Sequence, residues 1–149
     1  MKKIGIITII DNENCGNRLQ NYALQELITS FDFKVYTIKN DKLLNSSDNY
    51  IINYLRYIKK NIIAFLNKKK YLQFYDFNKN ILFTKKNYSC KSRDLNKKFD
   101  YFIAGSDQIW KPTRRRLSYM DLLEFADPNK RISYAASFGI EKIDSYAQK

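Results

Sequence analysis

The chain has 149 residues, which suits a single domain, and its 44% hydrophobic and 15% aromatic content argues against intrinsic disorder. Its 27 lysines and arginines outnumber its 15 acidic residues, which gives a net charge of +12. The basic residues are scattered in pairs along the chain, and this distribution disfavours nucleic-acid binding. A general attraction to anions remains. There is no histidine, and Cys15 and Cys90 are isolated, so an ordinary zinc site and a disulfide framework are excluded.

The first predicted element is a strand at Ile4–Ile10, a run rich in β-branched residues. After two lysines this run resembles a signal peptide, but it is short, contains Thr8 and ends at Asp11 without a cleavage site. No stretch reaches the roughly 18 apolar residues that a membrane span needs. Isolated thiols are typical of a reducing compartment. We therefore expect a soluble, cytoplasmic protein.

A helix is predicted from Arg18 onward, after turn residues that end at Gly16, with Asn17 as its N-cap. A second strand, Lys34–Ile38, follows the helix, so the segment is expected to form a β-α-β unit of a doubly wound parallel sheet. The apolar face predicted for the helix consists of Leu19, Tyr22, Ala23, Leu27, Ile28 and Phe31.

The loop before this helix has one glycine, so it is neither a dinucleotide-binding fingerprint nor a P-loop, and a standard nicotinamide or ATP site is not supported. Free N–H groups at the start of a helix, with Asn17 and Arg18 beside them, can hold an anion. The alternative is that Asn17 only caps the helix and that Arg18 is solvated.

The middle of the chain is read as largely helical. Apolar residues recur at helical spacing over Tyr50–Leu66, and Leu72–Phe77 continues the pattern. The apolar face of Tyr50–Leu66 would pack in the core or against a partner domain, or would lie peripherally on an anionic membrane. Ile81–Thr84 is apolar but of undetermined type, and Cys90–Lys98 is expected to include a short helix.

The stretch Phe99–Trp110 is the most informative. Tyr101–Ala104 predicts a strand buried on both faces, and Gly105 ends it abruptly. Ser106, Asp107 and Gln108 then present a hydroxyl, a carboxylate and an amide at the carboxyl end of the strand, where open α/β sheets bind ligands. The alternative is a plain turn. Trp110 is expected to pack beneath the site.

A last strand is predicted within Arg131–Ala136, with Ile132–Ala136 as its clearest part, and it is expected to be buried. Ser137 and Gly139 follow this strand, and Gly105 and Ser106 follow Tyr101–Ala104, so a hydroxyl and a glycine stand at the end of each strand. Two such corners on adjacent parallel strands would face one crevice. The fold class is therefore expected to be α/β, a Rossmann-like parallel sheet with flanking helices.

Three blocks in this order resemble the polysaccharide pyruvyl transferase family. They are Cys15-Gly-Asn-Arg-Leu-Gln-Asn-Tyr-Ala-Leu-Gln25, Gly105-Ser-Asp-Gln-Ile-Trp-Lys-Pro112 and Arg131-Ile-Ser-Tyr-Ala-Ala-Ser-Phe-Gly139. The resemblance implies transfer of a pyruvyl group from phosphoenolpyruvate to a sugar of a bacterial surface polysaccharide or its precursor, forming a ketal without a separate cofactor or metal. It also implies a fold like the two-domain glycosyltransferase (GT-B) type, in which residues 1–149 would be the first half and the second half is absent.

The resemblance and the strand-end rule together suggest the site residues. Ketal formation needs a general acid and a base, with cations or amides around the donor anions. Asp107 is a candidate base and Arg18 a candidate cation, but no catalytic residue is assigned, because donor-binding basic groups of the family lie largely in its second half. The substrate-binding residues expected at one edge of the sheet are Asn17, Arg18, Gly105, Ser106, Asp107, Gln108, Ser137 and Gly139.

Two further expectations concern partners. If a second domain or chain is missing, exposed apolar residues should gather near Gly105 and Gly139 or along Tyr50–Leu66, and the chain alone should not turn over. The rival functions are a free-standing domain that binds a glycan or sugar nucleotide without turnover, and a nucleic-acid binder that uses basic residues with interleaved tyrosine and phenylalanine.

Overall fold

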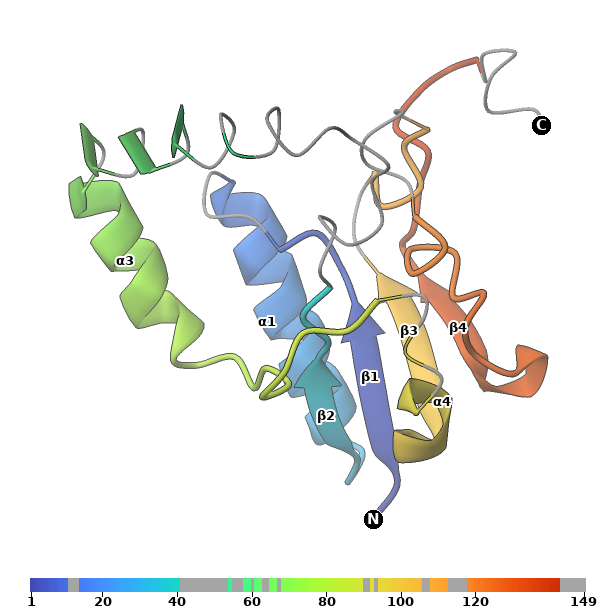
Figure 1. The fold of residues 1–149 in the computed structure, drawn as a ribbon. Coiled ribbons are helices and arrows are strands. Elements are labelled where there is room, and N and C mark those ends of the chain that lie inside the picture. The colour runs from blue at the N-terminus through green and yellow to red at the C-terminus, as the bar shows by residue number, and fades with distance from the viewer. Residues whose placement is uncertain are drawn as a thin grey trace.

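The computed structural model describes residues 1–10, 14–40, 54, 58–59, 61–62, 65–66, 68–89, 92, 94–105, 108–112 and 118–142. Its centre is a four-stranded, all-parallel sheet of order β2-β1-β3-β4 (Figure 1). The α/β fold with a parallel sheet is thereby confirmed. The four predicted strands are β1 (Lys3–Ile7), β2 (Lys34–Thr37), β3 (Tyr101–Gly105) and β4 (Arg131–Tyr134).

β1 is one of the two inner strands of the sheet, together with β3. It pairs with β2 in the register Ile4 to Val35 and with β3 in the register Ile4 to Tyr101. Ile6 and Ile7 are both fully buried although they point to opposite faces, because each face of the sheet is covered. This double burial explains why the strand is a continuous apolar run and does not alternate.

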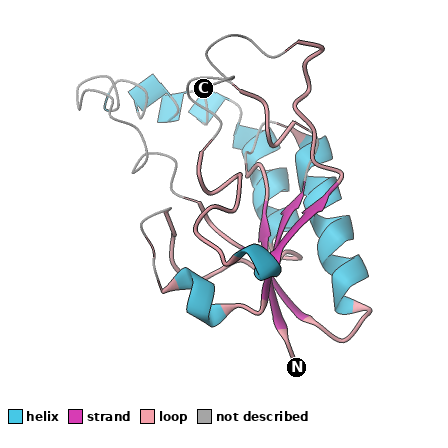
Figure 2. Cartoon of the chain, turned by 90° about the vertical axis from the view of Figure 1, so that its right-hand side faces the viewer, coloured by secondary structure: helices cyan, strands magenta, loops and turns pink. Residues whose placement is uncertain are grey.

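Helices lie on both sides of the sheet (Figure 2). One core cluster joins β1, β2 and β3 to α1 (Cys15–Thr29) and contains Leu24 and Ile28. The other lies between the opposite face and the segment that includes α4 (Leu95–Lys98) and the turns at 118–126. The short helix expected within Cys90–Lys98 is therefore confirmed as α4, whose Leu95 is fully buried.

The prediction of the start and inner face of α1 was wrong. Asn14, not Asn17, caps the helix: the Gly16 N–H donates to Asn14 Oδ1 over 2.8 Å. Leu19, Leu27 and Phe31 of the predicted apolar face are exposed. The buried stripe consists of Asn17, Arg18, Asn21, Leu24, Gln25 and Ile28.

Hydrogen bonds explain why polar side chains occupy that stripe. The Thr37 hydroxyl donates to Asn21 Oδ1 over 2.9 Å at the end of β2. Gln25 Nε2 donates to the Leu82 carbonyl (3.1 Å), and the Leu82 N–H donates to Gln25 Oε1 (2.8 Å). Since buried amides with such partners avoid the cost of desolvation, α1 can turn a polar stripe inward.

The Ile81–Thr84 segment runs beside β2. The Thr37 N–H donates to the Leu82 carbonyl, and the Thr84 N–H donates to the Thr37 carbonyl, which makes a parallel bridge between Thr37 and Phe83. α3 (Lys68–Asn78) precedes it and contains the predicted helix Leu72–Phe77. The Phe77 ring meets the Tyr22 ring of α1 edge-on, with 5.6 Å between centroids.

Most of the predicted helix Tyr50–Leu66 lies outside the described residues. Its described members are helical, and their apolar side chains are exposed: Tyr54, Ile58, Ile62, Phe65 and Leu66. In the described part of the chain, no helix has the length and apolar character needed to cross a bilayer.

The expectation that the last strand is buried was wrong. All four residues of β4 are exposed, whereas Val35 and Thr37 of β2, the other edge strand, are buried, so the side chains of β4 lack the cover that packing gives to β2 within the described residues. Ile132 and Tyr134 share one face of it, and Phe138 and Ile140 after it are exposed as well. Exposed apolar residues therefore do gather near Gly139.

A surface ion network holds the 86–98 segment and supplies a pH prediction. Asp94 Oδ2 accepts from Lys98 Nζ (2.7 Å) and from Lys86 Nζ (3.1 Å), and these bonds lower the pKa of Asp94 to about 2. A carboxylate with a lowered folded pKa adds stability above its unfolded pKa of 3.8 and loses it as the pH falls towards 2.

We therefore expect Asp94→Asn to lower the urea midpoint modestly at pH 7 and low salt, because the side chains are about half exposed. The difference from the unmodified chain should shrink in high salt and vanish near pH 2. A pH series of urea titrations checks this, and a difference that is independent of pH would show that the ion pairs are not its source.

Candidate functional site

The carboxyl ends of β1, β3 and β4 meet at one edge of the sheet because the strands are parallel, and α1 begins at the same edge (Figure 1). All described members of the predicted site belong to α1, to the last residue of β3 or to the loops that follow β3 and β4. Ser106 and Asp107 lie outside the described residues. Within the edge, the described members divide into two places.

The first place is the corner where the chain leaves β3 and β4. The Gln108 N–H donates to Ser137 Oγ over 3.0 Å, and the Trp110 N–H donates to the Ser137 carbonyl over 3.1 Å. These bonds join the loop after β3 to the loop after β4. The structure therefore brings Gln108, Ser137 and Gly139 together, as expected for two corners on adjacent strands.

The corner requires unusual backbone conformations. Gly139 has a φ of 61°, and a Cβ there would collide with the Gln108 side chain, so glycine is needed both for conformation and for space. Gln108 itself has a φ of 58°, which costs an L-residue roughly 1–2 kcal/mol. Backbone strain of this kind gathers at functional sites, and it motivates a binding role for this corner.

Trp110 packs as predicted. It lies against the core cluster on the α4 side of the sheet, and its Nε1 donates to the Asp121 carbonyl over 3.0 Å. Its ring lies 5.8 Å from that of Phe138, centroid to centroid. Trp110 therefore packs beneath the corner, on the side of the core cluster.

Gly105 has a packing role. A Cβ at Gly105 would lie 2.9 Å from Leu24 Cδ2 and 3.3 Å from the Tyr134 carbonyl oxygen, so α1 and β4 close over this residue. Its buried position leaves little room for a ligand to approach.

We expect Gly105→Ala to lower the free energy of unfolding by about 1–3 kcal/mol, the usual cost of overpacking a core. Chemical denaturation measures it. Ser133→Ala on exposed β4 is the matched control and should change stability by under about 0.5 kcal/mol. Equal stability of the two variants would show that the α1–β4 contact can relax freely.

The second place is at the start of α1. Asn17 and Arg18 are 8% and 3% exposed, so the alternative of a solvated Arg18 is wrong. The Arg18 guanidinium carbon lies 5.9 Å from the centroid of the Phe83 ring. Arg18 is thus directed to the β2 side of the edge, where the 81–84 segment runs.

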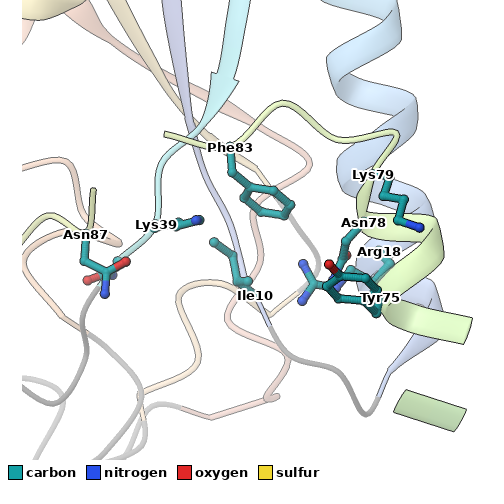
Figure 3. Close-up of a pocket in the computed structure, with 9 residues that line it drawn as sticks. Ile10, Arg18, Lys39, Tyr75, Asn78, Lys79, Phe83 and Asn87 are labelled. Atoms are coloured by element: carbon teal, nitrogen blue, oxygen red, sulfur yellow. The ribbon is translucent and has the colours of Figure 1, made fainter. Parts of the chain in front are cut away.

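Arg18 lines a cavity of about 480 Å³ (Figure 3). The lining residues come from the end of β1, from α1, from the chain after β2, from α3 and from the segment after it. They are Ile10, Arg18, Lys39, Asn40, Tyr75, Asn78, Lys79, Phe83 and Asn87. Of the predicted site residues that the structure describes, Arg18 alone is among them.

Sequence reasoning missed most of this cavity. Lys39 and Asn40 follow β2 at its carboxyl end, so the strand-end rule applied to the corners could have found them. Tyr75, Asn78 and Lys79 carry no such signal, because α3 reaches the edge only through tertiary packing.

A family model described as polysaccharide pyruvyl transferase matches residues 14–149. No curated protein and no solved structure matches the chain. The matched range contains both the corner and the cavity, apart from Ile10.

Proposed function

The chain belongs to the polysaccharide pyruvyl transferase family, and on that premise we propose that it takes part in moving a pyruvyl group from phosphoenolpyruvate to a sugar of a bacterial surface polysaccharide or its precursor. The observation that carries this proposal is the family match over residues 14–149, which includes every helix and strand of the described structure except β1. The parallel sheet with polar groups at its carboxyl edge supports it, because ligands of open α/β sheets bind there.

The reaction defines what the edge must supply. One sugar hydroxyl adds to C2 of phosphoenolpyruvate while C3 is protonated, and a second hydroxyl then displaces inorganic phosphate from C2 to close the ketal. A base must accept the hydroxyl protons, and an acid must donate one to C3. Donors or cations must stabilise the carboxylate and phosphate.

We assign the corner to substrate binding. The side chains of Gln108 and Ser137 are partly accessible there, and they can exchange hydrogen bonds with sugar hydroxyls. Asp107 remains the candidate base from sequence, whereas Arg18, the candidate cation from sequence, lines the cavity on the β2 side. No catalytic residue is assigned, since the chain has no histidine and the family's basic donor-binding groups are expected in a second half.

A second domain or a second chain is part of the proposal. Ile132 and Tyr134 on β4, with Phe138 and Ile140 beyond it, are between 38% and 51% exposed and follow the corner directly. A neighbouring domain that covers them would bury apolar area and close the corner over its substrate. We place this assembly in the cytoplasm, with peripheral contact to an anionic membrane as the alternative arrangement.

Binding without turnover is the second candidate function. It is favoured by the lack of histidine in the chain combined with a formed cavity at the sheet edge. In that case the domain would hold a glycan or a sugar nucleotide for another protein.

The test is release of inorganic phosphate from phosphoenolpyruvate in the presence of surface-polysaccharide oligosaccharides. We expect no turnover by the chain alone and turnover after addition of a second half taken from the family. Turnover by the chain alone would overturn the need for a second half. Oligosaccharide binding without turnover in either arrangement would replace the transferase proposal with the binding domain.

A further inference from the structure

We propose that the cavity between α1, α3 and the 82–88 segment binds a phosphorylated sugar, with Arg18, Lys39 and Lys79 around the phosphate. The cavity lies on the β2 side of the edge and is distinct from the corner formed by Gln108, Ser137 and Gly139. Its volume of about 480 Å³ is within the range of small-molecule sites.

The charge around the cavity favours an anion. Three of its described lining residues, Arg18, Lys39 and Lys79, are cationic, and none of that set is acidic. One carboxylate, that of Asp76, pairs with a lining cation: its Oδ1 lies 2.8 Å from Lys79 Nζ, and this contact raises the pKa of Lys79. Both partners of this pair are more than 60% exposed, so the pair is weak and leaves Lys79 able to meet a ligand.

Phe83 organises two of the cations. Arg18 and Lys39 approach its ring, with the guanidinium carbon at 5.9 Å and Lys39 Nζ at 5.8 Å from the centroid (Figure 3). Cations held against an aromatic face lose some of their freedom before a ligand arrives. Arg18 is also only 3% exposed, and its guanidinium fork suits the bidentate geometry of a phosphate.

Amide groups in the lining point to a sugar attached to that phosphate. Nδ2 and Oδ1 of Asn40 and Oδ1 of Asn78 are buried and have no hydrogen-bond partner among the described residues. A buried polar atom without a partner is unfavourable, so a ligand that pairs with these atoms is favoured. Sugar hydroxyls can both donate to Oδ1 and accept from Nδ2.

Aromatic side chains complete the fit. Tyr75 from α3 and Phe83 after it present rings in the same lining as the amides. A pyranose has an apolar C–H face that can lie on a ring, whereas inorganic phosphate and the small enol ester phosphoenolpyruvate lack one. The combination of cations, amides and rings therefore matches a sugar phosphate better than either. That this ligand takes part in the transfer rests on the proposed function; its binding does not.

Isothermal titration of the full chain with glucose 1-phosphate, inorganic phosphate and phosphoenolpyruvate tests the inference. We expect glucose 1-phosphate to bind at least about tenfold more tightly than the other two. Lys39→Gln and Lys79→Gln should each weaken it about tenfold, since a charge-assisted hydrogen bond contributes on the order of 1.5–3 kcal/mol. Lys85→Gln, an exposed lysine of the same segment that is outside the lining, is the matched control and should change little.

A further variant tests the sugar. Asn78→Leu should weaken the binding of glucose 1-phosphate and leave the affinity for inorganic phosphate unchanged. No binding of any of the three compounds, or equal weakening by Lys85→Gln, would overturn the inference. Preference for phosphoenolpyruvate would also overturn it, because the cavity would then be a donor site. Glucose 1-phosphate binding by a chain that fails the transfer assay would leave this inference standing and remove the proposed function.

Discussion

Phe102→Ala is expected to lower the free energy of unfolding by about 3–5 kcal/mol, the largest stability effect that we anticipate. Phe102 is fully buried in the middle of β3. Its ring lies 5.6 Å from that of Phe99 and 4.9 Å from that of Phe125, centroid to centroid. Truncation would remove these contacts and leave a cavity between the sheet and the 118–126 turns, because a close-packed core relaxes only in part.

Urea denaturation followed by circular dichroism measures the change. Phe31→Ala makes the same chemical change at a position that is 65% exposed, and it should cost less than about 0.5 kcal/mol. If the two variants were equally stable, the packing of the α4 side of the sheet described above would be wrong.

Gln25→Leu is expected to cost about 2–4 kcal/mol and to loosen the cavity as well. The Gln25 side chain is 2% exposed and makes two hydrogen bonds to the backbone of Leu82. Leucine keeps the volume but removes both bonds and leaves the Leu82 N–H unpaired, and an unpaired group costs more than a bond contributes. The neighbouring Phe83, which two cations approach, would then be held less firmly.

Two measurements separate these effects. Chemical denaturation gives the loss of stability, and titration with glucose 1-phosphate under folding conditions gives the loss of affinity. Gln73→Leu, on the exposed side of α3, is the matched control and should alter neither. A Gln25→Leu chain that binds as tightly as the unmodified chain would contradict the role assigned to the 82–84 segment.

The strands could be predicted because their signal is local. β1, β2 and β3 are short runs of β-branched and aromatic residues, and burial on both faces is what such runs require. The exposure of β4 could not be predicted from the same local signal. Whether the side chains of a strand are covered depends on which elements pack on its faces, and no pattern within Arg131–Tyr134 carries that information.

The inner face of α1 shows a different limit. Periodicity assigns apolar residues to the core, but Asn21 and Gln25 are buried because Thr37 and Leu82 offer them partners. These partners are 16 and 57 positions away along the chain, so only the folded structure reveals them. Local pattern therefore predicted the helix and misplaced its buried face.

The candidate site could be predicted only where its residues follow strands that the sequence reveals. The rule that ligands bind at the carboxyl ends of parallel strands located Gln108, Ser137 and Gly139 together at the corner. It placed Arg18 at the same edge but not in the cavity on the β2 side, because Tyr75 and Asn78 reach that cavity by the packing of α3.

The most direct test of the account is a map of amide chemical shifts in the ¹⁵N-labelled chain, recorded while glucose 1-phosphate and a surface-polysaccharide oligosaccharide are added in separate titrations. We expect shifts at the carboxyl edge of the sheet: near Arg18, Lys39 and Phe83 with the sugar phosphate, and near Gln108 and Ser137 with the oligosaccharide. Shifts confined to the opposite edge, around Phe33 and Asp100, would contradict it.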